Sequence, residues 1–230
     1  MAEPSPSLSA LVVQFDPQAA ELVHQLAHEL RQPLSAIEAI AYYLRIVLPH
    51  VDPRTRQQVD KLDLLAEQMN WILSDALHYF RAVTPHPQLL DLHELVSEAL
   101  VERGSADGPR FHADIPATPA LVSLDAAQAR HLLRSLIALF RQLAPPAGEV
   151  RIYSRVDETT VSLEFLAPGL TFSPEELYRW FEPFNPRMPA GSGMALASAR
   201  RIVEAHGGRI TARSDPATGT SIENAFPLAG

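Results

Sequence analysis

The feature that most constrains the fold is a pair of apolar stripes with helical spacing in the first third of the chain. The first stripe consists of Leu26, Leu30, Leu34, Ile37, Ala41, Leu44 and Leu48. The second consists of Val59, Leu62, Ala66, Met69, Leu73, Ala76 and Phe80. Steps of three and four residues are typical of one face of an amphipathic helix. Prolines at 49 and 53 interrupt the pattern between the stripes. The sequence therefore predicts two long helices joined by a short turn.

One such hairpin has an apolar face but nothing within itself to bury that face against. Two copies that pair as a four-helix bundle bury both faces, which is the usual solution for helices of this kind. We therefore expect a homodimer.

Beyond residue 84 the pattern changes to short strands and helices. Alternating segments predict strands at "RFHADIP", "ALVSLD", "EVRIYSRV", "TVSLEFLAP", "RITARSD" and "TSIENAFPL". Helical spacing recurs in "DLHELVSEAL", "DAAQARHLLRSLIALFRQL", "SPEELYRWF" and "SGMALASARRIVEAHGG". Mostly antiparallel strands with helices beside them indicate an α+β sandwich. The expected domains are a flexible tail at 1–14, the hairpin at 15–84 and the sandwich at 85–230.

Composition narrows the function and the location. The 230 residues carry a formal net charge of −8, which argues against a nucleic-acid partner. The sequence contains no cysteine, which excludes thiolate catalysis, disulfides and cysteine–zinc sites. We also find no apolar run of membrane-spanning length, no signal peptide and no histidine pairing typical of a metal site. Surface or packing roles are expected for the scattered histidines His50, His78, His86, His93, His112, His131 and His206. The expectation is a cytoplasmic protein without membrane contact or bound metal.

The segment "AHELRQPLSAI" places His28 roughly 200° around the helix from the apolar stripe, and so in solvent. Pro33 has no N–H, which deprives a helical carbonyl of its partner and allows a bend. A neutral imidazole is a good nucleophile toward phosphorus. Glu29 is placed to accept its proton, and Gln32, one turn further on the same side, to position a water molecule. A plain surface histidine beside an accidental kink is the alternative.

"HELRQPLSAI" resembles the H-box of histidine kinases, the phosphoacceptor segment of their dimerisation domain. "FEPF" at 181–184 resembles the F-box, and "GSGMALASARRIVEAHGG" the second glycine box, of the ATP-binding domain of that family. The resemblance covers about residues 15–228. It implies a four-helix bundle followed by an ATPase sandwich of the Bergerat type, with His28 as the phosphorylated residue. It also implies response-regulator receiver domains as partners, and an upstream histidine kinase as a further partner.

The nucleotide pocket that this resemblance implies departs from the family pattern. Ser135, Leu139 and Gln142 stand where the family has two asparagines and a lysine, and Leu139 has no oxygen for a cation. Phe165 stands in place of the aspartate that binds adenine. Glu164 is one residue away and is expected on the opposite face of its strand.

Each lost hydrogen bond to a charged group costs roughly 1.5–3 kcal/mol. Two or three such losses weaken binding by about 10³–10⁵-fold. Three glycines of the pocket motifs are retained, namely Gly169, Gly191 and Gly193, and the last two suit a tight helix N-terminus that could hold an anion. Preservation of a turn and a helix start by folding alone is the preferred interpretation of these two glycines, so no cofactor is expected.

Three functions compete. The first is a histidine phosphotransferase with a degenerate ATPase domain, in which His28 exchanges phosphate with response-regulator aspartates. The second is a working kinase that uses ATP and magnesium in a divergent pocket. The third is a non-catalytic module that only binds a response regulator. Enzymatic activity therefore stays open at this stage.

Overall fold

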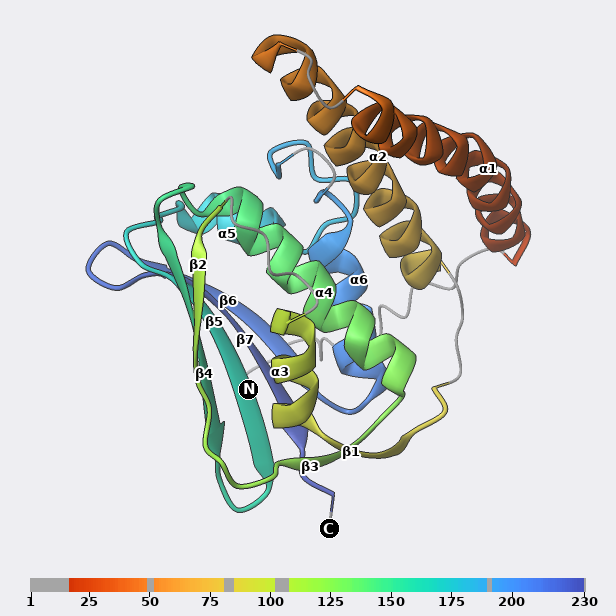
Figure 1. Ribbon diagram of the computed structural model, residues 1–230. Helices are drawn as coiled ribbons and strands as arrows, with labels where there is room; N and C mark the ends of the chain where they lie inside the picture. Colours follow the sequence, from red (N-terminus) through yellow and green to blue (C-terminus); the bar gives the residue numbers. More distant parts are fainter. Residues whose placement is uncertain (1–16, 49–51, 81–84, 102–107, 190–191, 230) are drawn as a thin grey trace.

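The computed structural model describes residues 17–48, 52–80, 85–101, 108–189 and 192–229. The predicted tail and the predicted domain boundary at 84 lie outside these residues. Two long helices, α1 (Pro17–Val47) and α2 (Pro53–Phe80), form an antiparallel hairpin at one end of the molecule (Figure 1). Asp52 caps the start of α2, because its carboxylate accepts hydrogen bonds from the backbone N–H groups of Arg54 and Thr55. The predicted helical hairpin is confirmed.

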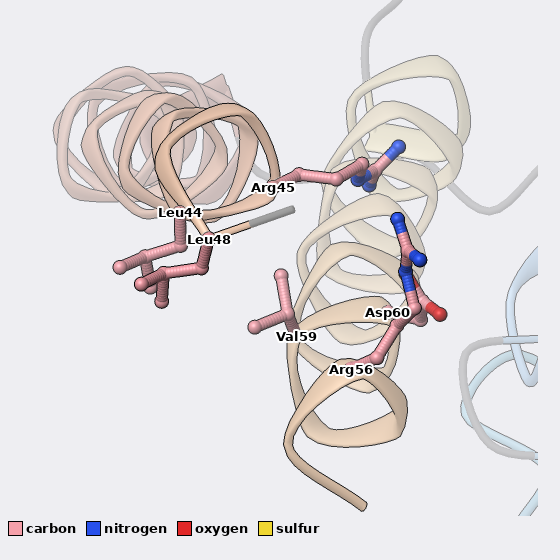
Figure 2. Close-up of a pocket in the computed structure, with 6 residues that line it drawn as sticks. All are labelled: Leu44, Arg45, Leu48, Arg56, Val59 and Asp60. Carbon is pink, nitrogen blue, oxygen red and sulfur yellow. The ribbon is translucent and has the colours of Figure 1, made fainter. Parts of the chain in front are cut away.

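Buried apolar residues line the contact between the two helices. Ala27, Leu34 and Ala41, seven residues apart, are buried on α1 and face α2. Their partners on α2 include the buried Val59 and Ala66. Polar contacts join the same faces, since Asn70 donates to Glu38 over 2.6 Å and Arg45 forms an ion pair with Asp63. Near the turn the helices leave a small notch (Figure 2), which is lined by Leu44, Arg45, Leu48, Arg56, Val59 and Asp60.

A broad apolar face of the hairpin remains exposed. On α1 it includes Leu22, Leu26, Leu30, Ile37 and Ile40, and on α2 it includes Leu62, Leu65, Met69 and Ile72. Pro33 does not interrupt α1, which continues through it. Large apolar side chains that are exposed at helical spacing on both helices indicate an interaction site.

A five-stranded sheet forms the second part of the molecule, in the order β2 (Arg110–Asp114), β4 (Glu149–Val156), β5 (Thr160–Ala167), β7 (Gly219–Pro227) and β6 (Arg209–Asp215). Strands β2 and β4 are parallel, and the other pairs are antiparallel. Asp157 closes the predicted β4–β5 turn by accepting hydrogen bonds from the N–H groups of Thr159 and Thr160. A separate two-stranded sheet pairs β1 (Gln88–Asp91) with β3 (Leu121–Leu124).

Helices α3 (Leu92–Val101), α4 (Ala126–Leu143) and α6 (Ala195–Ala205) lie over one face of the sheet (Figure 1). The short helix α5 (Pro174–Arg179) begins at Ser173, where the predicted N-cap forms a complete capping box with Glu176. The core lies between this helical layer and the sheet. The molecule thus has the predicted α+β architecture, a helical hairpin followed by a sandwich. Within the described ranges, no helix combines the length and the apolarity needed to cross a bilayer.

Candidate functional site

Helix α1 presents the predicted phosphoacceptor segment to solvent. Ala27 and Leu34 are 1–2% exposed and pack toward α2. One residue turns an α-helix by about 100°, so His28 points away from this packed side. His28, Glu29 and Gln32 are all exposed. No hydrogen bond or ion pair within the described part of the chain engages these three side chains, so the imidazole is open to a reaction partner.

Helix α4 carries the positions at which the pocket resemblance expects polar residues. Asp125 caps the helix by accepting from the N–H groups of Ala127 and Gln128. Burial raises the pKa of the Asp125 carboxyl, but hydrogen bonds from these groups and from the N–H of His86 outweigh burial and lower the pKa below its ordinary value. Leu139, further along α4, is 0% exposed and belongs to the core.

Strand β5 carries the position at which the resemblance expects the adenine-binding aspartate. Phe165 stands there and is 0% exposed. Burial alternates strictly along β5, so Glu164 points to the other face, where Arg155 lies 3.6 Å from its carboxylate. The chain therefore supplies core packing, and not a carboxylate, at this position.

The glycines differ in what they do. Gly169 adopts φ +74°, a conformation that favours glycine, and the space beside it is open. A Cβ on Gly193 would lie 3.2 Å from the backbone oxygen of Asn185. Gly191 lies outside the described residues. The two glycines that are described thus have local roles in a turn and in a close backbone approach.

The described residues between α5 and α6 include several that are buried against the rest of the domain. Asn185 is buried, and its side-chain amide donates to the backbone oxygen of Arg179 over 2.9 Å. Met188 and Ser192 are also buried. The hydroxyl of Ser192 donates to the side-chain oxygen of Gln142 on α4 over 3.1 Å. Gln142, which stands in place of the family's lysine, is thus engaged in holding this segment.

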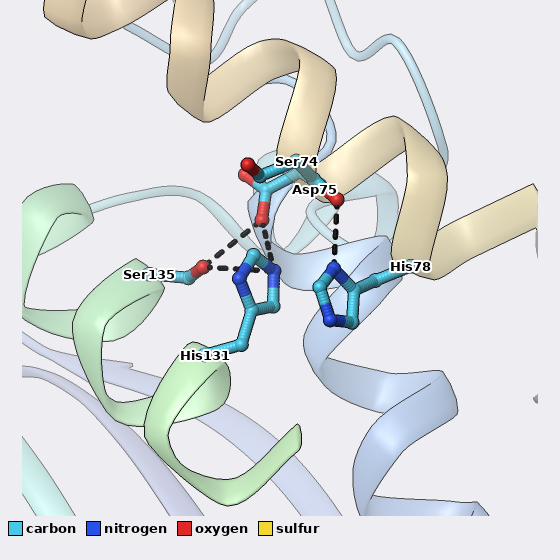
Figure 3. Close-up of polar contacts among 5 residues, drawn as sticks. All are labelled: Ser74, Asp75, His78, His131 and Ser135. Carbon is cyan, nitrogen blue, oxygen red and sulfur yellow. Dashed lines mark hydrogen bonds and ion pairs between the residues drawn. The ribbon is translucent and has the colours of Figure 1, made fainter. Parts of the chain in front are cut away.

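A buried polar cluster joins α2 to α4 (Figure 3). Asp75 on α2 accepts a hydrogen bond from the hydroxyl of Ser135 over 2.9 Å. The same carboxylate oxygen lies 2.9 Å from Nε2 of His131. The ring of His78 stacks on that of His131 with centroids 3.7 Å apart. In a serine-hydrolase triad, one ring nitrogen of the histidine faces the serine and the other faces the carboxylate. Here the same nitrogen, Nε2 of His131, faces both Ser135 and Asp75. The cluster is therefore not such a triad.

Sequence reasoning missed this cluster. It identified Ser135 only as a substituted pocket residue, and it expected His78 and His131 to have separate surface or packing roles. The spacing carried a weak signal, because His131 and Ser135 are four residues apart and share one face of α4. Two further histidines make packing or capping contacts: His93 is buried and bonded to Thr118 and Ser154, and His206 accepts a hydrogen bond from the N–H of Asp125.

A family model described as "Histidine kinase-, DNA gyrase B-, and HSP90-like ATPase" matches residues 124–230. This range includes α4, β5 and α6, and with them every candidate pocket position described above. It excludes the hairpin.

Relatives extend the similarity to the hairpin. The signal transduction histidine-protein kinase BaeS of Escherichia coli is 30% identical over 223 residues, which are 90% of this chain and 46% of the relative. The alginate biosynthesis sensor protein KinB of Pseudomonas aeruginosa is 25% identical over 228 residues, 93% of this chain and 38% of the relative. This chain thus spans less than half the length of each of these relatives.

Solved structures agree on the fold. The mycobacterial sensor histidine kinase MprB superposes with a TM-score of 0.55 at 27% identity, over 62% of this chain and 97% of that one. Full-length ShkA, solved in complex with AMPPNP, superposes with a TM-score of 0.65 at 20% identity, over 91% of this chain and 46% of that one. The ShkA comparison covers both the hairpin and the sandwich, and at that identity it bears on the fold alone.

Proposed function

This chain has a histidine kinase core, a helical hairpin followed by a GHKL-type ATPase domain, and we propose that it acts as a histidine phosphotransferase and not as an ATP-dependent kinase. In this proposal His28 exchanges a phosphoryl group with the aspartates of response-regulator receiver domains. The observation that carries the proposal is a contrast between two sites. His28 is exposed and unengaged, whereas the pocket positions at Leu139 and Phe165 are closed into the core.

The nucleotide side of the contrast follows from chemistry. A hard cation such as Mg²⁺ needs oxygen ligands, and the adenine amino group needs an acceptor. Leu139 and Phe165 offer neither. Ser135 and Gln142 are polar, but their side chains are bonded to Asp75 and Ser192. The residues present do not fit ATP and magnesium, so no step of the proposed reaction uses them.

The phosphotransfer step needs only groups on α1 and the partner. A ring nitrogen of His28 attacks the phosphorus of an aspartyl phosphate, the N–P bond forms, and the P–O bond to the aspartate breaks. The aspartate leaves as a carboxylate, and the imidazole loses its N–H proton. Glu29, adjacent in sequence and exposed, is the proposed acceptor of that proton. The reverse transfer, or hydrolysis by a water held at Gln32, returns the histidine to its starting state.

We further propose that the chain acts as a homodimer. The exposed apolar face on α1 and α2 fits a second copy of the same hairpin, and the resulting four-helix bundle leaves His28 outside its core. Receiver domains would dock beside this exposed histidine.

Phosphotransfer from a charged receiver domain tests the proposal. The purified chain is mixed with a panel of receiver domains phosphorylated by acetyl phosphate, and acid-labile phosphate on the chain is measured by mass spectrometry. We expect phosphate on His28, and none on His28→Ala. His24→Ala is a matched control, because His24 lies one turn earlier on α1 and is also exposed. Binding of a receiver domain without transfer would contradict phosphotransferase activity and favour a binding module.

A further inference from the structure

We propose that Asp75, His131 and Ser135 form a polar lock that fixes the ATPase domain against helix α2 in one orientation. The lock joins residues that are 60 positions apart, Asp75 on the hairpin and Ser135 on α4 (Figure 3). This inference does not depend on the proposed phosphotransfer, because it concerns how the two domains are held together.

The carboxylate of Asp75 is buried between the two domains. Asp75 is 2% exposed and Ser135 is 3% exposed, while His131 is 8% exposed. A buried carboxylate is strongly destabilising unless hydrogen bonds compensate it. Here both compensating groups, the hydroxyl of Ser135 and the imidazole of His131, come from the other domain. Asp75 therefore loses these partners when the domains separate, which makes its contacts specific for the docked arrangement.

Aromatic rings of α2 cover the cluster. His78, one turn after Asp75 on α2, stacks its ring on His131 with an interplanar angle of 6°. Nδ1 of His78 lies 2.8 Å from the backbone oxygen of Ser74, which fixes the orientation of the ring along α2. The ring of Trp71, one turn before Asp75 on α2, has its centroid 6.3 Å from that of His131. Two aromatic rings of α2 thus lie near the imidazole that α4 contributes.

Helix α2 also contacts α6 and Phe184, which precedes α6. The guanidinium of Arg201 on α6 donates to the backbone oxygen of Tyr79 and lies 5.3 Å from the centre of the Tyr79 ring. The ring of Phe80 lies 6.3 Å from that of Phe184. The last two turns of α2 therefore contact both α4 and α6. Two separate contacts oppose rotation of the ATPase domain relative to α2 about either one of them.

These contacts give Ser135 a role that its position in the pocket does not predict. Its hydroxyl, at the place where the resemblance expects the family's first asparagine, donates to Asp75 on the hairpin. In the proposed lock this side of α4 therefore serves domain docking. The lock sets the orientation in which His28 and the ATPase domain are presented to a partner.

Distance measurement between the domains tests the lock. Because the chain has no cysteine, Gln57→Cys on α2 and Glu158→Cys in the β4–β5 turn give two unique, exposed sites for spin labels. The labelled chain is mixed with a large excess of unlabelled chain, so that a dimer carries at most one labelled copy. Pulsed electron resonance should then show one narrow distance distribution. In Asp75→Ala the distribution should broaden to at least about twice its width. Asp60→Ala, which removes an exposed carboxylate of α2, should leave it unchanged.

Ser135→Ala provides a second test that leaves the carboxylate in place. It removes one of the two compensating groups and should broaden the distribution less than Asp75→Ala does. Circular dichroism establishes that each variant keeps its helices and strands. A narrow, unshifted distribution in folded Asp75→Ala would overturn the proposal, and so would equal broadening in Asp60→Ala. Neither result bears on phosphate transfer to His28, which is measured separately.

Discussion

The ring of Phe165 packs on that of Phe140, with centroids 5.8 Å apart and ring planes 23° from parallel. Phe165 comes from β5 and Phe140 from α4, so the contact joins the sheet to the helical layer. Both residues are 0% exposed. The strand position that resembles an adenine-binding site in sequence is therefore part of the core in this chain.

Returning an aspartate to this position should damage the fold. Phe165→Asp removes a packed ring and buries a carboxylate without a partner. We expect a loss of more than about 4 kcal/mol in the free energy of unfolding, measured by urea denaturation. Phe165→Leu keeps an apolar side chain and should cost about 1–2 kcal/mol. If Phe165→Asp unfolded at the same urea concentration as the wild type, the prediction would be wrong and the site would tolerate an open polar pocket.

The cap of α4 gives a prediction for pH. The lowered pKa of Asp125 means that the folded state favours its ionised form, so its contribution to stability is present above the unfolded value of about 3.9. That contribution is lost as the pH falls through the folded pKa. Asp125→Asn keeps a capping oxygen without the charge. The stability difference between wild type and Asp125→Asn should therefore shrink as the pH falls from 7 toward the folded pKa. A difference that grows over this range would contradict the assignment.

The apolar face of the hairpin predicts the oligomeric state. Ile37→Asp places a charge on this face and should convert a dimer into a monomer, as measured by analytical ultracentrifugation. Ser35→Asp adds the same charge on a different, exposed side of α1 and should leave the dimer intact. If Ile37→Asp sediments as the wild type does, the proposed bundle is wrong.

Glu29 is proposed to accept the proton of His28 during phosphotransfer. Glu29→Gln keeps the shape and the exposure of the side chain but removes its basicity. We expect the transfer rate from a charged receiver domain to fall by about 10²-fold. Glu21→Gln, on the same helix two turns earlier, should leave the rate unchanged. An undiminished rate in Glu29→Gln, measured by rapid quench, would remove Glu29 from the mechanism.

Local patterns predicted much of the fold because local physics decides it. The spacing of the apolar stripes gives α1 and α2, and the alternation at Phe165 and Glu164 gives the two faces of β5. Ser173 followed by Glu176 is a capping signal that needs no tertiary information. Strand β1, only four residues long, was not predicted, because it depends on its pairing with the distant strand β3.

The cluster of Asp75, His131 and Ser135 could not be predicted from local patterns either, because it also depends on distant segments of the chain. A charged residue on an amphipathic helix is ordinarily solvated, and nothing near Asp75 in the sequence indicates otherwise. Its burial depends on Ser135 and His131, which only the tertiary arrangement brings to it. The sequence pattern therefore did not reveal polar contacts between residues that are far apart in the chain.

Calorimetric titration of the purified chain with ATP and magnesium tests the central claim most directly, which is that the core of a histidine kinase persists here without a nucleotide site. A catalytic domain of a working histidine kinase, titrated under identical conditions, establishes that binding is detectable. The account predicts no saturable heat for this chain up to millimolar ATP. Saturable binding at micromolar to millimolar concentration would contradict it.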